Sequence, residues 1–164
     1  MDIISHKIKK RNKPKDIFIT PLELSKSHID MIEYNDNDIW LDPCKNNGSY
    51  YNQFPNNNKD YCELLENKDF FNYNKKVDII IQNPPYHLID KWIDKNIELN
   101  PRIISLLIGI NNLTTRRIEK LNVNGYGLSK LRMLKVWSWF GMSLIVVFEK
   151  NKKNVIEIDR KVWR

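Results

Sequence analysis

The sequence predicts an α/β fold: a doubly wound, mostly parallel β-sheet that ends in an antiparallel hairpin. Short runs of apolar and β-branched residues near positions 39, 60, 78, 103, 132 and 144 have the length of buried strands. Helical patterns separate most of these runs, and such alternation is typical of parallel strands joined by helices. The last two runs are joined by only a few residues, which predicts the closing hairpin.

The predicted helices follow from local signals. Thr20 before Pro21 indicates a helix of roughly 12–14 residues, with the Thr20 hydroxyl as its cap and proline at its first position. A short helix could begin within residues 49–54. Residues 87–99 place apolar side chains on one helical face, and residues 111–121 predict a helix with a polar start.

Two parts of the sheet depart from regular alternation. The stretch between Glu63 and Val77 is too short for a strand–helix–strand connection of normal size, so helices there should be abbreviated or absent. A turn at residues 124–127 precedes the final strands, expected at residues 131–139 and 143–149. This hairpin carries three aromatic residues that belong to the core or to the wall of a pocket, with the core favoured: Trp137, Trp139 and Phe140.

Length and charge limit the possible functions. The 164 residues suffice for one domain, and a net charge of +7 favours an anionic partner, nucleic acid first, although such a charge can also serve solubility. No apolar run approaches the roughly 18 residues of a membrane span, and no secretory signal is evident, so we expect no membrane association. Cys44 and Cys62 show no metal-ligand spacing, so no metal site is predicted, and they indicate a cytoplasmic setting, bacterial or in an infected host cell.

The chain divides into three expected regions. Residues 1–16 hold six basic residues without periodicity, and they predict a flexible arm that either follows a phosphate backbone or is simply a solvated tail. Residues 17–150 form the predicted folded domain. Residues 151–164 are expected to be a basic C-terminal tail, loose or weakly extended.

The buried strand that starts at Val77 ends at Asn83, Pro84, Pro85 and Tyr86. Prolines cannot donate to a sheet and keep the preceding backbone extended, so a rigid turn should follow the strand where ligands bind in open α/β sheets. The Asn83 side-chain oxygen and the Pro84 carbonyl could accept hydrogen bonds from the exocyclic amine of a nucleobase, and thereby stabilise the charge that grows as it attacks a methyl sulfonium. Tyr86 could stack on a flipped base. The alternative is an ordinary turn, because Asn-Pro is a common turn starter.

This tetrapeptide, residues 83–86, resembles the catalytic motif of the S-adenosylmethionine-dependent amino-methyltransferases, chiefly the adenine-N6 DNA methyltransferases. The same motif occurs in relatives that methylate guanine N2 in RNA or a glutamine side chain in protein. In its shortness, the chain is most similar to the small phage- or virus-type members of this family. The resemblance implies a Rossmann-like class-I fold, S-adenosylmethionine as cofactor, S-adenosylhomocysteine as product, and direct methyl transfer without a metal.

A strand, tight loop and possible helix follow one another at residues 39–54, a geometry that brings backbone N–H groups to a ligand. The resembled family has a cofactor loop of the form Asp-Pro-x-x-Gly-x-Gly there, which Asp42, Pro43 and Gly48 match. Asn46 occupies the first glycine position. Asparagine is, after glycine, the residue that most readily adopts a left-handed conformation, so the turn can survive this change.

Two acidic positions are implied in holding the rest of the cofactor. Glu63 lies near the end of the second strand, 15 residues after Gly48, where nucleotide-binding folds place an acid on the ribose hydroxyls; Glu66 is the rival candidate. The resemblance assigns the cofactor adenine to Asp69 and Phe70. A surface acid at a strand end is the alternative for Glu63.

The segment before the first strand completes the implied cofactor site. Phe18, Thr20 and Pro21 match a family element that closes over the methionine end of the cofactor. A capped amphipathic helix without any such role explains the same residues equally well.

The sequence therefore predicts an S-adenosylmethionine-dependent N-methyltransferase, with adenine in DNA as the first acceptor and RNA or protein glutamine as alternatives. A non-catalytic nucleic-acid-binding or assembly subunit with a degenerate fold is the rival. Asn46, the short chain and the lack of a separate target-recognition domain favour that rival. A small basic chain would hold duplex DNA weakly alone, so a homodimer or a partner subunit is expected.

Overall fold

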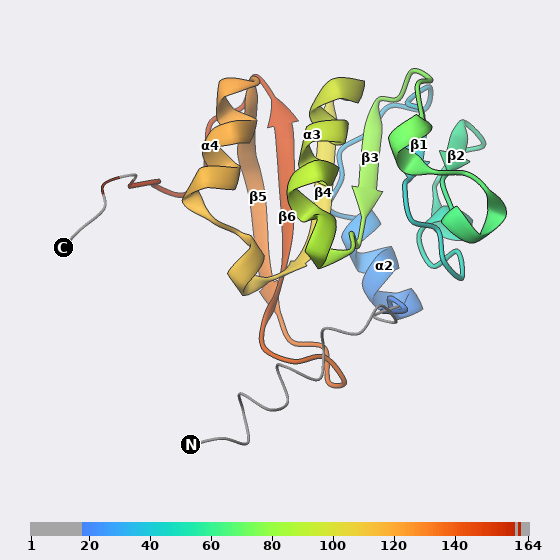
Figure 1. Cartoon of the computed structure of the whole chain (residues 1–164), viewed down its shortest axis with the longest axis horizontal. Helices are drawn as coiled ribbons and strands as arrows, with labels where there is room; N and C mark the ends of the chain where they lie inside the picture. The colour runs from blue at the N-terminus through green and yellow to red at the C-terminus, as the bar shows by residue number, and fades with distance from the viewer. Residues whose placement is uncertain (1–17, 160, 162–164) are drawn as a thin grey trace.

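A computed structural model gives the structure of residues 18–159 and 161. A six-stranded sheet with the order β2-β1-β3-β4-β6-β5 forms the middle layer (Figure 1). The first four strands of this order pair in parallel, and β6 pairs antiparallel with both β4 and β5. The predicted parallel sheet with a terminal antiparallel hairpin is thus confirmed. The strands are β1 (Trp40–Asp42), β2 (Lys59–Tyr61), β3 (Ile79–Gln82), β4 (Ile103–Gly109), β5 (Tyr126–Leu134) and β6 (Ser143–Lys150).

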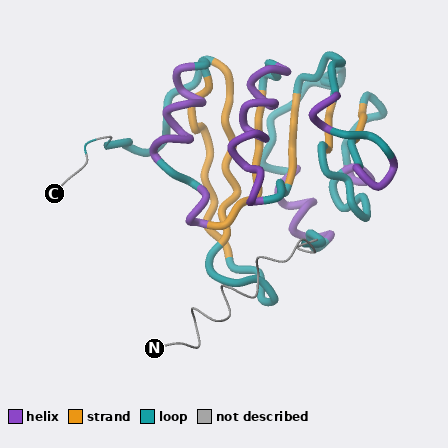
Figure 2. Tube along the Cα trace, viewed as in Figure 1, coloured by secondary structure: helices purple, strands orange, loops and turns teal. Residues whose placement is uncertain are grey.

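Helices cover both faces of the sheet, although unequally. Helices α3 (Ile89–Leu99) and α4 (Thr115–Val123) lie on the front face, whereas α2 (Leu22–Ile29) lies behind it (Figure 1). The connections around β1 and β2 are mostly loop (Figure 2), with single helical turns at 64–66 and 70–72. The expected abbreviation of helices between Glu63 and Val77 is what the structure shows. The predicted arm at residues 1–16 lies outside the described residues.

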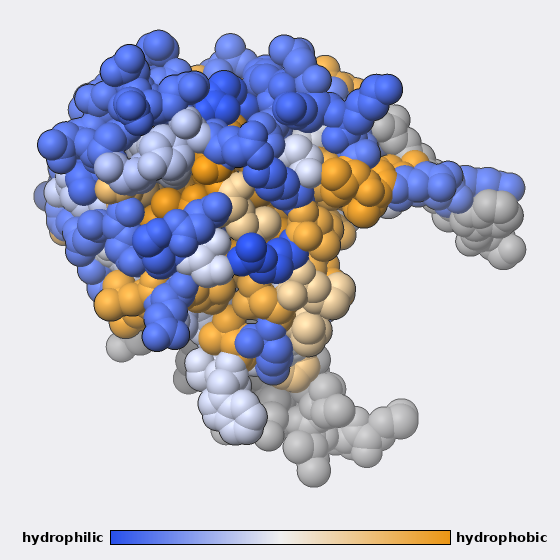
Figure 3. Space-filling model, turned by 180° about the vertical axis from the view of Figure 1, so that it is seen from behind, coloured by the Kyte–Doolittle hydropathy of each residue, from blue (hydrophilic) through white to orange (hydrophobic). Residues whose placement is uncertain are grey.

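Alternation along β4 divides the core into two layers. Ile104, Leu106 and Ile108 face the front and pack with residues of α3 and α4. Ile103 and Leu107 face the rear and pack with α2 and the residues after it. Seen from behind, apolar surface is exposed across the middle of the molecule (Figure 3).

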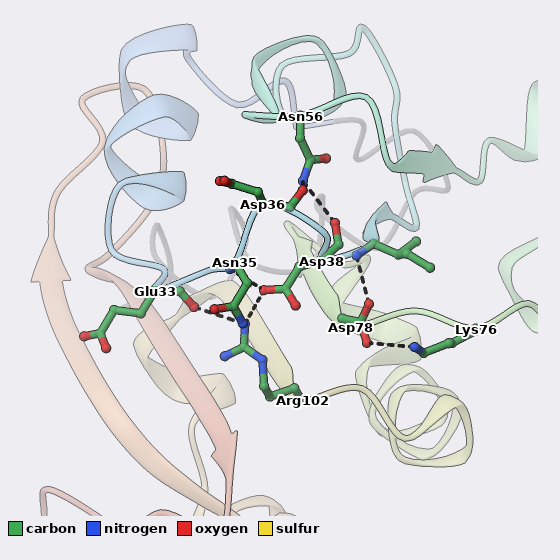
Figure 4. Close-up of polar contacts among 9 residues, drawn as sticks. Glu33, Asn35, Asp36, Asp38, Asn56, Lys76, Asp78 and Arg102 are labelled. Atoms are coloured by element: carbon green, nitrogen blue, oxygen red, sulfur yellow. Dashed lines mark hydrogen bonds and ion pairs between the residues drawn. The ribbon is translucent and has the colours of Figure 1, made fainter.

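Polar contacts hold the amino-terminal edge of the sheet together (Figure 4). The Asp78 carboxylate, just before β3, accepts a hydrogen bond from the Ile39 N–H at 2.9 Å. Arg102, just before β4, forms an ion pair with Asp38 and donates to the Glu33 carbonyl at 3.2 Å. These contacts join the start of three parallel strands to the turn after α2, and leave the opposite, carboxyl-terminal edge available for a site.

Helix α2 is shorter than predicted and begins differently. It has eight residues, and its cap is Pro21, with no side chain capping it. Thr20 is buried and its hydroxyl is used elsewhere, so the predicted Thr20 cap is wrong. The helix ends because the chain turns at Asp30 to bring Ile32 into the core, and the Ile32 N–H bonds to the Ile29 carbonyl at 2.9 Å.

Two other predicted helices also differ. Helix α4 begins at Thr115 rather than at residue 111, because the Thr114 hydroxyl caps it by accepting from the Arg117 N–H at 3.4 Å. The chain within residues 49–54 forms one helical turn, Tyr51–Gln53, and no longer helix.

The closing hairpin is shifted toward the N-terminus. β5 already starts at Tyr126, because Tyr126 and Leu128 fill the core, so the predicted turn at 124–127 ends early. The strand ends at Leu134, and the loop of residues 135–142 extends beyond the sheet. The core prediction for Trp137 and Phe140 is wrong, since their side chains are 96% and 62% exposed. Trp139 is half-buried and packs against the rear core.

The start of the C-terminal tail is attached to β5. The Asn154 side-chain oxygen accepts from the Leu128 N–H at 2.8 Å, and the Val155 N–H donates to the Leu128 carbonyl at 2.8 Å. The tail passes so close to β5 that a Cβ at Gly127 would lie 2.0 Å from the Lys152 carbonyl oxygen. Of the two predicted forms, loose or weakly extended, the contacts at Asn154 and Val155 favour the extended one for residues 151–155.

We expect Gly127→Ala to lower the free energy of unfolding by about 2–3 kcal/mol, because backbone atoms on both sides cannot make room for the methyl group. Gly109→Ala is the matched control, since the nearest atom to its new Cβ lies at 3.6 Å, an ordinary contact. Urea unfolding of both variants measures the difference. Equal stability of the two variants would contradict the close approach of the tail to β5.

Candidate active site at the carboxyl-terminal edge

Three segments far apart in the sequence meet at the carboxyl-terminal edge of the sheet. β1 and β3 are parallel neighbours, so Asp42 at the end of β1 and Asn83 just after β3 lie at the same edge. The Cys44 thiol donates to the Asn83 carbonyl at 3.2 Å, and the Asn83 Nδ2 donates to the Thr20 Oγ1 at 3.3 Å. The structure thus brings together the predicted loop, the predicted catalytic turn and the segment before α2.

The turn of residues 83–86, called the elbow from here on, is also held from the front face. Gln82, the last residue of β3, is fully buried. Its side chain donates to the Asn96 Oδ1 at 3.1 Å and accepts from the Trp92 indole N–H, both on α3. Within the described residues, neither the Asn83 Oδ1 nor the Pro84 carbonyl accepts a hydrogen bond. The elbow is therefore fixed by its surroundings while two of its acceptors stay available.

Tyr86 occupies the far end of the elbow. Its ring lies against the end of β4, where a Cβ at Gly109 would be 3.6 Å from the Tyr86 Cε2 atom. Burial raises the pKa of the Tyr86 hydroxyl, against the opposing hydrogen bond of the Gly109 backbone, so the ring stays neutral. Pro84 is buried and Pro85 and Tyr86 are half-buried. The stacking role of Tyr86 stays a prediction.

The loop after β1 has the backbone that the sequence suggested. Asn46 adopts a left-handed conformation, with φ of 50°, and Gly48 has φ of 82°. The Asn46 N–H donates to the Glu63 carboxylate at 2.7 Å, and the Leu65 N–H donates to its other oxygen at 3.1 Å. Glu63 is thus next to the loop, whereas Glu66 is engaged by Lys45. Of the two acids, Glu63 is the better placed for a ligand on this loop.

Asp42 is the most unusual group at this edge because it is fully buried. Its Oδ1 accepts from the Cys44 N–H at 3.2 Å, whereas its Oδ2 has no hydrogen-bond partner in the part of the chain that the structure describes. Burial raises the pKa of this carboxyl from 3.8 to about 7, against the opposing effect of the Cys44 N–H. A buried carboxylate oxygen without a donor is costly, so Asp42 suits a ligand that brings an N–H or O–H group.

The predicted adenine site is only partly formed by the expected residues. Asp69 accepts from the Phe71 N–H at 2.9 Å and starts the turn at residues 70–72. Phe70 is 2% exposed, with its ring 4.9 Å from that of Trp92, so it belongs to the core. Phe71 is 37% exposed and is the more accessible ring at this turn. The roles of Asp69 and Phe70 toward a cofactor stay predictions.

The segment before α2 lies against the same edge. The Thr20 carbonyl accepts from the Ser49 hydroxyl at 2.7 Å, which ties this segment to the loop after β1. Phe18 packs edge-on against Trp139, with ring centroids 5.8 Å apart, and Pro21 is exposed.

Two hollows of the surface lie away from this edge. One is beside α2, and another lies between the start of β5 and the C-terminal tail. Neither includes Asp42 or the elbow. Across residues 18–159 and 161, no three His, Cys, Asp or Glu side chains gather as metal ligands would. Every helix in this part of the chain is too short or too polar to serve as a transmembrane span.

The loop of residues 135–142 is a feature of this edge that sequence reasoning missed. In Figure 1 the β3 arrow points to the edge from which this loop extends. The Ile110 N–H donates to the Met142 carbonyl at 3.0 Å, and Ser143 pairs with Gly109, the residue that Tyr86 contacts. The exposed Trp137 is therefore presented on the same edge as the elbow. Gly141, whose φ of 71° marks a turn, is the sequence signal that could have revealed the loop.

Structural comparison identifies the fold. No protein-family model matches the chain, and no curated protein matches it by sequence. A crystal structure of a putative RNA methyltransferase from Pyrococcus horikoshii is similar, with a TM-score of 0.59 and 17% identity over 79% of this chain and 80% of that one. The Mtq2–Trm112 complex from E. cuniculi is described as responsible for methylating the eRF1 translation termination factor. Its TM-score is 0.59 and its identity is 20%, over 82% of this chain and 99% of that one. TYW2 from M. jannaschii, solved in complex with AdoMet, is similar with a TM-score of 0.53 and 18% identity, over 83% of this chain and 79% of that one.

The fold is that of the class-I methyltransferases. The expected Rossmann-like class-I architecture is confirmed at this level, because the six-stranded sheet and its terminal hairpin match these proteins. At identities of 17–20%, the similarity establishes architecture and leaves the acceptor open.

We expect Asp42→Asn to stabilise the ligand-free protein at pH 8. The carboxyl has a folded-state pKa of about 7 against 3.8 as its ordinary value, so its contribution to stability is fully present below pH 3.8 and is lost as pH rises through about 7. Asparagine cannot ionise and avoids this loss, a gain of roughly 2–4 kcal/mol at pH 8. Urea unfolding at pH 8 and pH 4 measures the gain, which should shrink at the lower pH. A pH-independent difference would show that Asp42 is not held in its neutral form by burial.

Proposed function

We propose that this protein is an S-adenosylmethionine-dependent N-methyltransferase that acts on the N6 amine of adenine in DNA. The observation that carries the proposal is the pairing, on one edge of a class-I methyltransferase fold, of a buried Asp42 carboxylate whose Oδ2 has no donor among the described residues with an elbow whose amide oxygen is available. The small phage- or virus-type subfamily belongs to the proposal as well, on the basis of the resemblance at residues 83–86.

The residues at this edge suit the cofactor. Asp42 can accept from its ammonium or hydroxyl groups, and Glu63 and Asp69 keep carboxylate lone pairs for the ribose and the adenine amine. The N–H groups of Cys44, Lys45, Asn46 and Gly48 in the loop after β1 already donate within the protein, so the acidic side chains carry the fit to the cofactor. When bound, S-adenosylmethionine supplies a methyl group on a sulfonium, and the acceptor nitrogen takes it while sulfur keeps the bonding pair, leaving S-adenosylhomocysteine. The protein then contributes by binding the cofactor and by orienting the acceptor nitrogen toward the methyl group.

The elbow provides that orientation for the acceptor. The Asn83 Oδ1 and the Pro84 carbonyl can accept the two amine hydrogens, which favours a tetrahedral nitrogen and stabilises its growing positive charge. Tyr86 stays neutral and can stack on the base. The extra proton on the amine leaves to solvent afterwards.

The acceptor class rests on charge and on the exposed loop. The net charge of +7 favours nucleic acid over protein, and Trp137 offers a 96% exposed ring on the same edge as the elbow, available to a base near the target. Similar structures include enzymes named for RNA and one complex named for a protein factor, so RNA and protein glutamine remain the alternative acceptors. The latter complex has two subunits, which favours a partner subunit or a homodimer for this chain also.

We expect the purified protein to bind S-adenosylmethionine, and Asn83→Ala to bind it with the same Kd while methyl transfer falls by about 10²–10³-fold. The amide oxygen acts on the acceptor in the transition state, so its loss leaves cofactor affinity unchanged. Isothermal calorimetry and transfer of a labelled methyl group measure the two effects. If the wild-type protein shows no binding at millimolar cofactor, the non-catalytic assembly role replaces the enzyme.

We expect Trp137→Ala to raise KM for a single-stranded DNA acceptor by about tenfold with little change in kcat, since a stacked base contributes roughly 1–3 kcal/mol. Transfer to single- and double-stranded DNA, RNA and protein is compared for both proteins. Val123→Ala is the control, because this side chain is 73% exposed at the end of α4, on the opposite edge of the sheet (Figure 1). A KM effect of the same size in the control would contradict a stacking role for Trp137.

A further inference from the structure

A series of buried polar side chains leads from the elbow to the rear face of the sheet. The Asn83 Nδ2 donates to the Thr20 Oγ1 at 3.3 Å. The Thr20 hydroxyl lies close enough to the Tyr50 hydroxyl to oppose the rise that burial causes in the Tyr50 pKa. The Tyr50 hydroxyl lies 2.9 Å from the His28 Nδ1, and the His28 Nε2 lies 2.6 Å from the Ser105 Oγ. Thr20 and Tyr50 are 5% and 3% exposed, and His28 and Ser105 are fully buried. These five residues are called the relay below.

The far end of the relay determines the direction of every hydrogen bond in it. The Val146 carbonyl lies 3.3 Å from the Ser105 Oγ and offers an acceptor for its single hydrogen. When Ser105 donates there, its oxygen accepts from an N–H on the His28 Nε2, which leaves the Nδ1 to accept from the Tyr50 hydroxyl. The Tyr50 oxygen can in turn accept from the Thr20 hydroxyl, whose oxygen accepts from the Asn83 amide nitrogen.

His28 keeps this order fixed because it stays neutral. Burial, followed by the charge of Arg132, lowers the pKa of the His28 imidazole to about 3. One ring nitrogen therefore carries a hydrogen and the other accepts one at any pH near neutrality. Burial also raises the pKa of the Tyr50 hydroxyl, so that residue remains a donor.

The direction of the hydrogen bonds in the relay decides which way the Asn83 side-chain amide is turned. The oxygen and nitrogen of a side-chain amide have nearly the same shape, so packing alone does not distinguish the two orientations. With the relay in the direction described, Thr20 accepts from the nitrogen and the Asn83 Oδ1 remains available. With the opposite direction, the Thr20 hydroxyl would donate to the Asn83 oxygen, and the amide would present its NH₂ group to an amine that also donates.

We propose that Thr20, Tyr50 and His28 are positioning residues that set the Asn83 amide with its oxygen toward the acceptor amine. This inference rests on the proposed function for its catalytic meaning, whereas the hydrogen-bond order itself does not. Ser105 is the residue that selects the direction, through its bond to the Val146 carbonyl.

The first test reads the tautomer of His28 directly. The chain has three histidines, so a variant with His6→Gln and His87→Gln leaves His28 as the single signal in ¹⁵N-histidine NMR. We expect hydrogen on the Nε2 and none on the Nδ1, unchanged between about pH 5 and pH 8, as a buried neutral imidazole requires. Hydrogen on the Nδ1 would reverse the relay and overturn the inference.

The second test removes relay hydroxyls one at a time. Tyr50→Phe and Thr20→Val should each shift the side-chain amide resonances of Asn83, which are assigned by their absence in Asn83→Ala. Thr20→Ser keeps a hydroxyl and should restore the resonances. Tyr51→Phe is the matched control, because the same change one residue later lies outside the relay. Wild-type amide resonances in both Thr20→Val and Tyr50→Phe would overturn the inference.

Kinetics connect the relay to catalysis. We expect Tyr50→Phe to lower kcat by at least about tenfold, because a randomly oriented amide loses transition-state stabilisation, while the Kd for S-adenosylmethionine stays within about twofold. If Tyr50→Phe does not fold, as judged by its unfolding transition, the Thr20→Val and Thr20→Ser pair gives the same comparison. Absence of methyl transfer in the wild-type protein would refute the proposed function, and the NMR results would still decide the relay.

Discussion

Parallel pairing of β1 with β3 is the constraint on which the candidate site depends. It places the ends of two strands, 41 positions apart at Asp42 and Asn83, on one edge of the sheet. Neighbouring parallel strands end at the same edge of the sheet, so the loops that follow them meet there, whatever elements connect the two strands. The polar contacts of Asp78 and Arg102 hold the other ends of the strands. The chain can therefore lack several helices near β2 and still keep the geometry of the edge.

The edge combines rigidity with groups that are unfavourable in isolation. A buried carboxylate at Asp42 with one oxygen lacking a donor lowers stability. Such features are kept where they serve a ligand, because binding sites are often less stable than the structure permits. Contacts on both faces of the sheet offset this, with Gln82 bonded to α3 in front and Thr20 bonded to Asn83 behind. The stability of this edge and the geometry of the candidate site thus both depend on the contacts of Gln82, Thr20 and Asn83.

Much of the fold could be predicted because its signals are local. The β-branched run before Asn83, the prolines that end it and the left-handed Asn46 each act within a few residues. What the sequence could not show depends on distant partners. Thr20 looks like a helix cap, yet its hydroxyl bonds to Asn83, 63 positions away. Trp137 has a large aromatic side chain of the kind that usually lies in a core, and only the position of its loop beyond the sheet exposes it.

Helix α2 has a consequence for how this protein tolerates substitutions. Among the described residues it is the helix that covers the rear of the sheet, and it also carries His28, which bonds to Tyr50 and Ser105. The inner surface of α2 packs against the rear core and also reaches Ser105 of β4 through a hydrogen bond of His28. A substitution that repacks this surface should therefore alter both the packing of the sheet and the polar contacts behind the elbow.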